Sequence, residues 1–82
     1  MKLPRDLSAA QLIKALAKLG YRETRQTGSH VRLVDASAPA HHLTVPLHDP
    51  LRVGTLAAIL ADIAKRHQLT REQLLDVLFD GH

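Results

Sequence analysis

The chain contains no cysteine and no tryptophan, and it has only one tyrosine and one phenylalanine. Without cysteine, neither a disulfide scaffold nor a thiolate zinc site can form. The absence of disulfides is consistent with a reducing compartment, and we expect a cytoplasmic protein. Because aromatic residues are so few, the base-stacking platforms of many single-strand-binding proteins are nearly absent as well.

Long apolar runs are also missing. No run approaches the roughly 20 residues that span a bilayer, and residues 1–5 are too few and too polar for a secretory signal. We therefore expect no membrane partner. The 82 residues suit one domain covering 1–82. Its core must be aliphatic, since Leu, Ala, Val and Ile supply most of the 45% hydrophobic content.

The spacing of apolar residues predicts an α+β fold. Ser8 and Gln11 form a capping-box pattern at the start of a helical period, and Gly20 can end that helix in a left-handed cap. Alternating stretches then predict an antiparallel three-stranded sheet, and helical spacing returns after Gly54. We expect a helix over 8–19, strands over 21–26, 29–34 and 43–45, a loop over 35–41, a helix from 56 that fades at 65–67, and a short C-terminal helix opened by a second capping box at Thr70 and Gln73.

The segment Arg-Gln-Thr-Gly-Ser-His-Val-Arg over 25–32 carries the most chemical information. A glycine turn presents His30 at the start of a strand, and the period of two puts Arg32 on the same face. The imidazole can take or give a proton near neutral pH, and guanidinium groups match phosphate oxygens. Such a group could cleave RNA through its own 2′-hydroxyl, which DNA lacks.

These residues alone leave a second interpretation open. An isolated histidine beside arginine is common on a solvated strand face, where it has no catalytic role. The net charge of +3 permits an anionic partner without establishing one. The basic residues concentrated before Gly54 suggest an RNA-facing surface on the first helix and the hairpin, although lysine is also ordinary on a solvated helix. These basic residues are Lys2, Arg5, Lys14, Lys18, Arg22, Arg25, Arg32 and Arg52.

A combination of short motifs resembles the HicA toxin family. The motifs are Leu-Gly-Tyr over 19–21, Gly-Ser-His over 28–30, Val-Pro-Leu-His over 45–48, Gly-Thr-Leu over 54–56 and Ile-Leu over 59–60, after an opening Lys-Leu-Pro-Arg-Asp-Leu-Ser over 2–8. The resemblance covers roughly residues 2–75. No single piece is specific, but their order and spacing together are.

The resemblance implies a fold, an activity and a partner. It implies a double-stranded-RNA-binding-domain-like fold with a helix, a three-stranded antiparallel sheet, a helix and a short C-terminal helix. It also implies an mRNA endoribonuclease (an mRNA interferase) that is paired with a HicB antitoxin. The family's catalytic histidine corresponds to His30, and its motif glycine corresponds to Gly28. We expect the antitoxin to bury His30, because covering it would hinder access of RNA.

Other candidate residues follow from position and chemistry. His48 follows the Val-Pro-Leu motif and is the candidate for a second acid or a phosphate contact, although a loop histidine at a turn is the commoner case. No metal site is expected, because no histidine pair has helical spacing and the carboxylates are scattered. We therefore expect cleavage without a metal or any other cofactor. The predicted RNA-binding residues are Gly28, Ser29, Arg25, Arg32, Lys2 and Arg5.

Two non-catalytic functions remain as alternatives. A double-stranded-RNA-binding module would suit the same order of elements and would tolerate His30→Ala. A protein-interaction domain would dock a partner on its exposed sheet face and would bind RNA weakly at any salt concentration. Neither module requires an imidazole after the Gly28-Ser29 turn, so that segment favours the ribonuclease.

Overall fold

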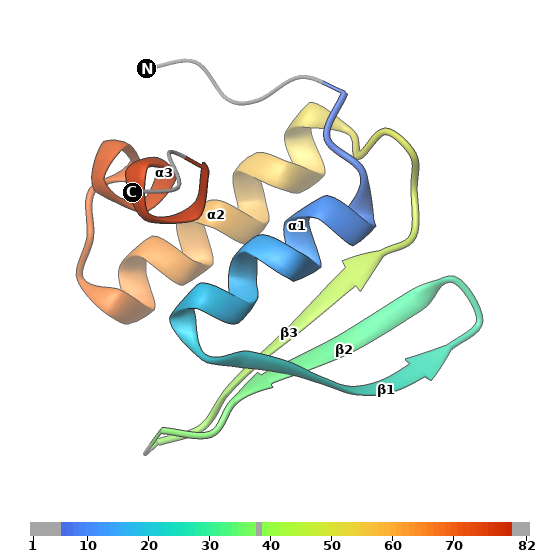
Figure 1. Ribbon diagram of the computed structural model, residues 1–82, viewed down its shortest axis with the longest axis horizontal. Coiled ribbons are helices and arrows are strands. Elements are labelled where there is room, and N and C mark those ends of the chain that lie inside the picture. The colour runs from blue at the N-terminus through green and yellow to red at the C-terminus, as the bar shows by residue number, and fades with distance from the viewer. Residues whose placement is uncertain (1–5, 38, 80–82) are drawn as a thin grey trace.

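Three helices lie on one side of a three-stranded sheet in the computed structural model, the first two against the sheet and the last against these two helices (Figure 1). The structure describes residues 6–37 and 39–79. The elements are α1 (Ala9–Leu16), a 3-10 turn η1 (Ala17–Leu19), β1 (Tyr21–Thr27), β2 (His30–Asp35), β3 (His41–Pro46), α2 (Val53–His67) and α3 (Arg71–Phe79). This layout confirms the predicted α+β class, and its order is compatible with a double-stranded-RNA-binding-domain-like arrangement.

Local signals determine where the first helix begins and ends. The Ser8 hydroxyl accepts a hydrogen bond from the Gln11 backbone N–H at 3.1 Å, and the Ser8 N–H donates to Gln11 Oε1 at 2.9 Å. This reciprocal pair satisfies two backbone groups that a helix start otherwise leaves unpaired. At the other end Gly20 has φ +93°, a left-handed conformation that glycine adopts without a Cβ penalty. The chain can therefore turn directly into β1.

The sheet is an antiparallel meander in the order β1-β2-β3. The side chains of Val31, Leu33, Leu43 and Val45 point to one face and are buried against the helices. Leu12 and Leu16 of α1, Leu56, Leu60 and Ile63 of α2 and Leu74 and Leu78 of α3 complete this largely aliphatic core. The opposite face, which we call the open face, is not covered by any described helix.

Several boundaries differ from the expectation. β2 continues through Asp35, whose side chain is buried, so the loop expected over 35–41 is shorter than predicted. β3 runs from His41 to Pro46 rather than over 43–45, because His41 continues the pairing with Asp35. α2 begins at Val53, three residues before its first core leucine. Among the described residues, no helix is both long and apolar enough to cross a membrane.

Candidate active site

His30 lies at the mouth of the β1–β2 hairpin, as the first residue of β2. It pairs with Thr27 across a two-residue turn in which Gly28 has φ +58°. A left-handed conformation of this kind is typical of tight hairpin turns and favours glycine. The turn is also tied to the end of β3, since the Leu47 N–H donates to the Ser29 carbonyl at 2.6 Å. The imidazole is exposed, and the backbone that carries it is held in place by the hairpin pairing and by this hydrogen bond.

A β-bulge in β1 brings Arg25 to the open face. Glu23 pairs with Leu33 and Arg25 pairs with Arg32, so Thr24 is an extra residue in β1 between these two pairs. An extra residue reverses the alternation of side chains along a strand. The Thr24 hydroxyl donates to the Arg32 carbonyl at 3.3 Å and so connects the bulge to β2. Arg25 consequently shares a face with Arg32 and His30.

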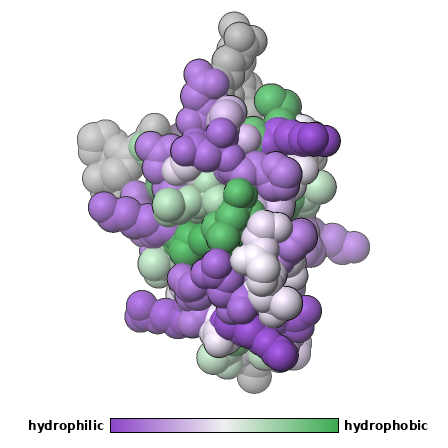
Figure 2. Space-filling view, turned by 90° about the vertical axis from the view of Figure 1, so that its right-hand side faces the viewer, coloured by the Kyte–Doolittle hydropathy of each residue, from purple (hydrophilic) through white to green (hydrophobic). Residues whose placement is uncertain are grey.

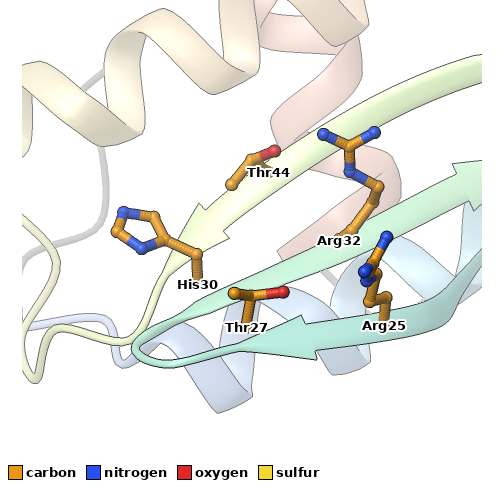
Figure 3. A pocket seen from close by; sticks show the side chains of 5 residues that line it. All are labelled: Arg25, Thr27, His30, Arg32 and Thr44. Atoms are coloured by element: carbon orange, nitrogen blue, oxygen red, sulfur yellow. The ribbon is translucent and has the colours of Figure 1, made fainter.

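These side chains surround an open hollow of about 180 Å³. All of the labelled side chains project from the same side of the sheet, with His30 next to the turn and the two arginines further along the strands (Figure 3). A hollow lined by an imidazole and two guanidinium groups is suited to an anion, because guanidinium groups form charge-assisted hydrogen bonds with phosphate oxygens. Its lining residues are Arg25, Thr27, His30, Arg32 and Thr44.

The other predicted RNA-binding residues lie in different places. Ser29 is exposed in the turn beside His30, and its carbonyl is engaged by Leu47, but its side chain does not line the hollow. His48 is exposed in the loop after β3 and also lies outside the lining. Lys2 and Arg5 lie outside the described residues. The two arginines and His30 are thus the predicted site residues whose side chains line one hollow.

The lysines of the first helix are separated from this hollow. Lys14 and Lys18 line a different hollow between α1 and α3, and the Lys18 ammonium group donates to the Leu78 carbonyl at 3.0 Å. α1 packs on the buried face of the sheet, whereas His30 lies on the open face. The suggested common RNA surface of helix and hairpin is therefore divided between the two sides of the sheet.

A second polar group lies on the buried face, at the end of the sheet far from His30. Tyr21 pairs with Asp35, and Asp35 pairs with His41, so the three residues form one row across the strands. The Tyr21 hydroxyl oxygen is 2.6 Å from His41 Nδ1 and 3.0 Å from Nε2 of His67, the last residue of α2. His41 Nε2 also lies 3.3 Å from Oδ2 of Asp62 in α2. This group, which we call the tyrosine cluster, connects α2 to the sheet.

Charge and burial shift the pKa values in the tyrosine cluster. Burial, and secondarily the negative charge of Asp35, raise the pKa of Tyr21 to about 12, although Arg66 opposes this shift. Hydrogen bonds from the backbone N–H and the hydroxyl of Ser37, at 3.1 and 2.8 Å, hold the pKa of Asp35 below its ordinary value. The cluster therefore favours a neutral phenol beside an ionised carboxylate.

The sequence did not reveal the tyrosine cluster. Asp35 was expected in a loop and His67 only at the end of a helix, whereas His67 Nε2 lies 3.7 Å from Asp35 Oδ2. The adjacent histidines lie on opposite faces of β3, as alternation along a strand requires: His41 is half-buried on the side of the core and His42 is exposed. Over residues 6–37 and 39–79, no group of three or more potential ligand side chains is arranged to hold a metal ion.

Comparison with known protein families identifies a matching family. The sequence model described as the HicA toxin of bacterial toxin–antitoxin systems matches residues 9–64. This span includes α1, the whole sheet and most of α2, and therefore the complete lining of the hollow. No curated protein and no solved structure matches the chain.

Proposed function

The chain belongs to the HicA toxin family, and from this membership we propose that it is an endoribonuclease that cleaves mRNA with His30 as its general acid/base. The observation that supports the proposal is the hollow on the open face, where an exposed imidazole lies beside Arg25 and Arg32. In this proposal residues 1–82 act as one toxin domain in the cytoplasm.

The proposed reaction uses the substrate's own hydroxyl as the nucleophile. The His30 imidazole removes the 2′-hydroxyl proton, and the 2′ oxygen forms a bond to the adjacent phosphorus. The bond from phosphorus to the 5′ oxygen breaks, and this leaving oxygen takes up a proton. The products are a 2′,3′-cyclic phosphate and a 5′-hydroxyl end. Arg25 and Arg32 stabilise the negative charge that develops on the phosphorus oxygens.

The proton for the leaving oxygen comes from water, from the protonated His30 or from a second acid. His48 is the candidate for a second acid, because it belongs to the loop that follows β3 and this loop is hydrogen-bonded to the hairpin turn through Leu47 and Ser29. A single titrating group gives a pH–rate profile with one limb, whereas a base together with an acid gives a bell. The proposal requires no metal and no cofactor.

The test is cleavage of a single-stranded RNA by purified protein, free of antitoxin, in EDTA. We expect cutting of RNA but not of the matching DNA, with cyclic phosphate ends, and loss of cutting in His30→Ala. The exposed imidazole has no hydrogen bond to another described residue, so this variant should keep the wild-type circular dichroism spectrum. Equal cutting by wild type and His30→Ala would refute the role of His30. Salt-sensitive binding without cutting would favour a non-catalytic RNA-binding module.

His48→Ala is the matched histidine variant, since its side chain lies outside the hollow. Wild-type cutting by His48→Ala would assign the proton transfers to His30 and water. Loss of only the alkaline limb of the pH–rate profile would identify His48 as the acid.

The proposed partner is a HicB-type antitoxin that covers His30. Figure 2 shows apolar surface among hydrophilic side chains on the side of the molecule that carries the hairpin turn and the loop after β3. Leu47 and Val53, which flank this loop, are 40% and 59% exposed. Exposed apolar side chains beside a charged hollow suit a protein interface with an apolar centre and a polar rim. A complex in which His30 remains open to solvent would contradict this prediction.

A further inference from the structure

Positive charge on the open face extends beyond the hollow. The strand register places the open-face side chains in three successive rows. None of these side chains is a carboxylate. The row at the turn holds Thr27, His30 and Pro46, the middle row holds Arg25, Arg32 and Thr44, and the far row holds Arg22, Val34 and His42.

We infer that the open face binds the backbone of single-stranded RNA along the stretch that runs from the His30 hollow to Arg22. In this arrangement Arg22 contacts a phosphate next to the one that is cleaved. The inference rests on the proposed ribonuclease function. At about 3.3 Å per residue, adjacent rows on the same face lie about 7 Å apart. This separation is comparable with that of successive phosphates in an extended strand, so the guanidinium of Arg22 can reach the next phosphate along.

The size of the face favours a single strand over a duplex. From the turn row to the far row the face measures about 13 Å, and three strands at about 4.8 Å spacing make it about 10 Å wide. Recognition of double-stranded RNA by a domain of comparable fold spans two successive minor grooves, or about 16 base pairs. The open face is too short for that contact, whereas it is long enough for a few nucleotides.

The chemistry of the face predicts binding through the backbone rather than through the bases. Neither aromatic residue is available for stacking, because Tyr21 is buried in the core and Phe79 packs against the core from α3. Phosphate contacts therefore dominate, and they carry little sequence preference. For single strands, each neutralised phosphate contributes a slope of about −0.7 to the dependence of log K on log salt.

The test compares Arg22→Gln with Arg71→Gln, which removes the same charge from an exposed position on α3. Each protein is titrated with single-stranded DNA of about twelve nucleotides, which lacks the reactive hydroxyl but retains the phosphates. Fluorescence anisotropy at several salt concentrations gives the affinity. Cleavage of a ribodinucleotide and of a longer RNA is measured in parallel.

We expect Arg22→Gln to weaken binding of the longer strand about fivefold, as for loss of about 1 kcal/mol, and to reduce the salt slope by about 0.7. Its KM for the longer RNA should rise while its kcat and its cleavage of the dinucleotide stay at wild-type values. Arg71→Gln should match wild type throughout.

Three results would overturn the inference. These are wild-type binding by Arg22→Gln, an equal loss in Arg71→Gln, and tighter binding of a duplex than of the single strand. Failure of the proposed function is distinguishable from all of these. If wild type cuts no RNA but Arg22→Gln alone weakens single-strand binding, the binding face stands and the ribonuclease does not.

Discussion

The ionisation of Tyr21 gives a direct test of the tyrosine cluster. The pKa of this phenol is about 12, compared with an ordinary value of 10.0, because it is buried and lies near Asp35. Tyr21 is the only tyrosine in a chain without tryptophan, so the near-ultraviolet change on phenol ionisation reports this residue alone. We expect a midpoint near 12 in the native protein and near 10 in concentrated urea.

The same shift predicts how stability depends on pH. The folded state holds the phenolic proton more tightly than the unfolded state does. The associated stability is therefore complete below pH 10 and is lost as pH rises to about 12. Two pKa units correspond to about 3 kcal/mol, and the 2% exposure of Tyr21 leaves little solvent screening. The charged or titratable groups that face the phenol are His41, His67, Asp35, Asp62 and Arg66.

Urea denaturation of wild type and Tyr21→Phe between pH 8 and 12 measures this contribution. Lysine deprotonation affects both proteins, so the difference between their pH profiles isolates the phenol. Near neutral pH, Tyr21→Phe should lose about 1–3 kcal/mol, because it removes the hydroxyl that is hydrogen-bonded to two part-buried imidazole nitrogens. A native midpoint near 10, or parallel pH profiles for the two proteins, would refute the arrangement described for the cluster.

Three further perturbations test other parts of the fold. The pKa of Asp35 is lowered in the folded state, so ionised Asp35 stabilises the fold at pH values above its ordinary pKa of 3.8, and this stability is lost as pH falls through the folded pKa. Asp35→Asn should therefore flatten the acid limb of a profile of urea stability against pH. An unchanged acid limb would contradict the Ser37 hydrogen bonds. Gly20→Ala should cost about 1–2 kcal/mol by thermal denaturation, since alanine is strained at φ +93°, and full wild-type stability would argue against the left-handed cap. Ser8→Ala should cost about 1 kcal/mol through loss of the capping box, measured as a lower urea midpoint with unchanged slope; a wild-type midpoint would contradict the capping box.

The sequence predicted those features that depend on neighbouring residues. The capping box at Ser8, the glycine at the end of η1 and the glycine of the hairpin turn are all local signals, and each lies where it was expected. The alternation in β2 likewise placed His30 and Arg32 on one face of the strand, and both side chains are exposed there. Boundaries such as the start of α2 were less well predicted, because no side chain caps that helix at Arg52.

Features that depend on distant residues could not be predicted in this way. In the tyrosine cluster, Tyr21 meets His41 and His67, which are 20 and 46 positions away in sequence. Each of these residues has an unremarkable neighbourhood in the chain, and only the pairing of the strands and the docking of α2 bring them together. From the sequence alone, His67 therefore shows only its position at the end of a helix, and its contact with Tyr21 becomes visible only once the packing of α2 on the sheet is known.

The position of Arg25 shows how strongly a site can depend on one backbone irregularity. Strict alternation from the buried Tyr21 would place Glu23 and Arg25 on the helix-covered face, and Arg25 would then be turned away from His30. Thr24 reverses the alternation, and its hydroxyl anchors the bulge to the Arg32 carbonyl. The bulge thus supplies the second guanidinium group of the hollow without altering the row of Arg22 at the far end. Arg25 of the proposed reaction site and Arg22 of the proposed binding face consequently lie on the same strand, one on each side of the inserted Thr24.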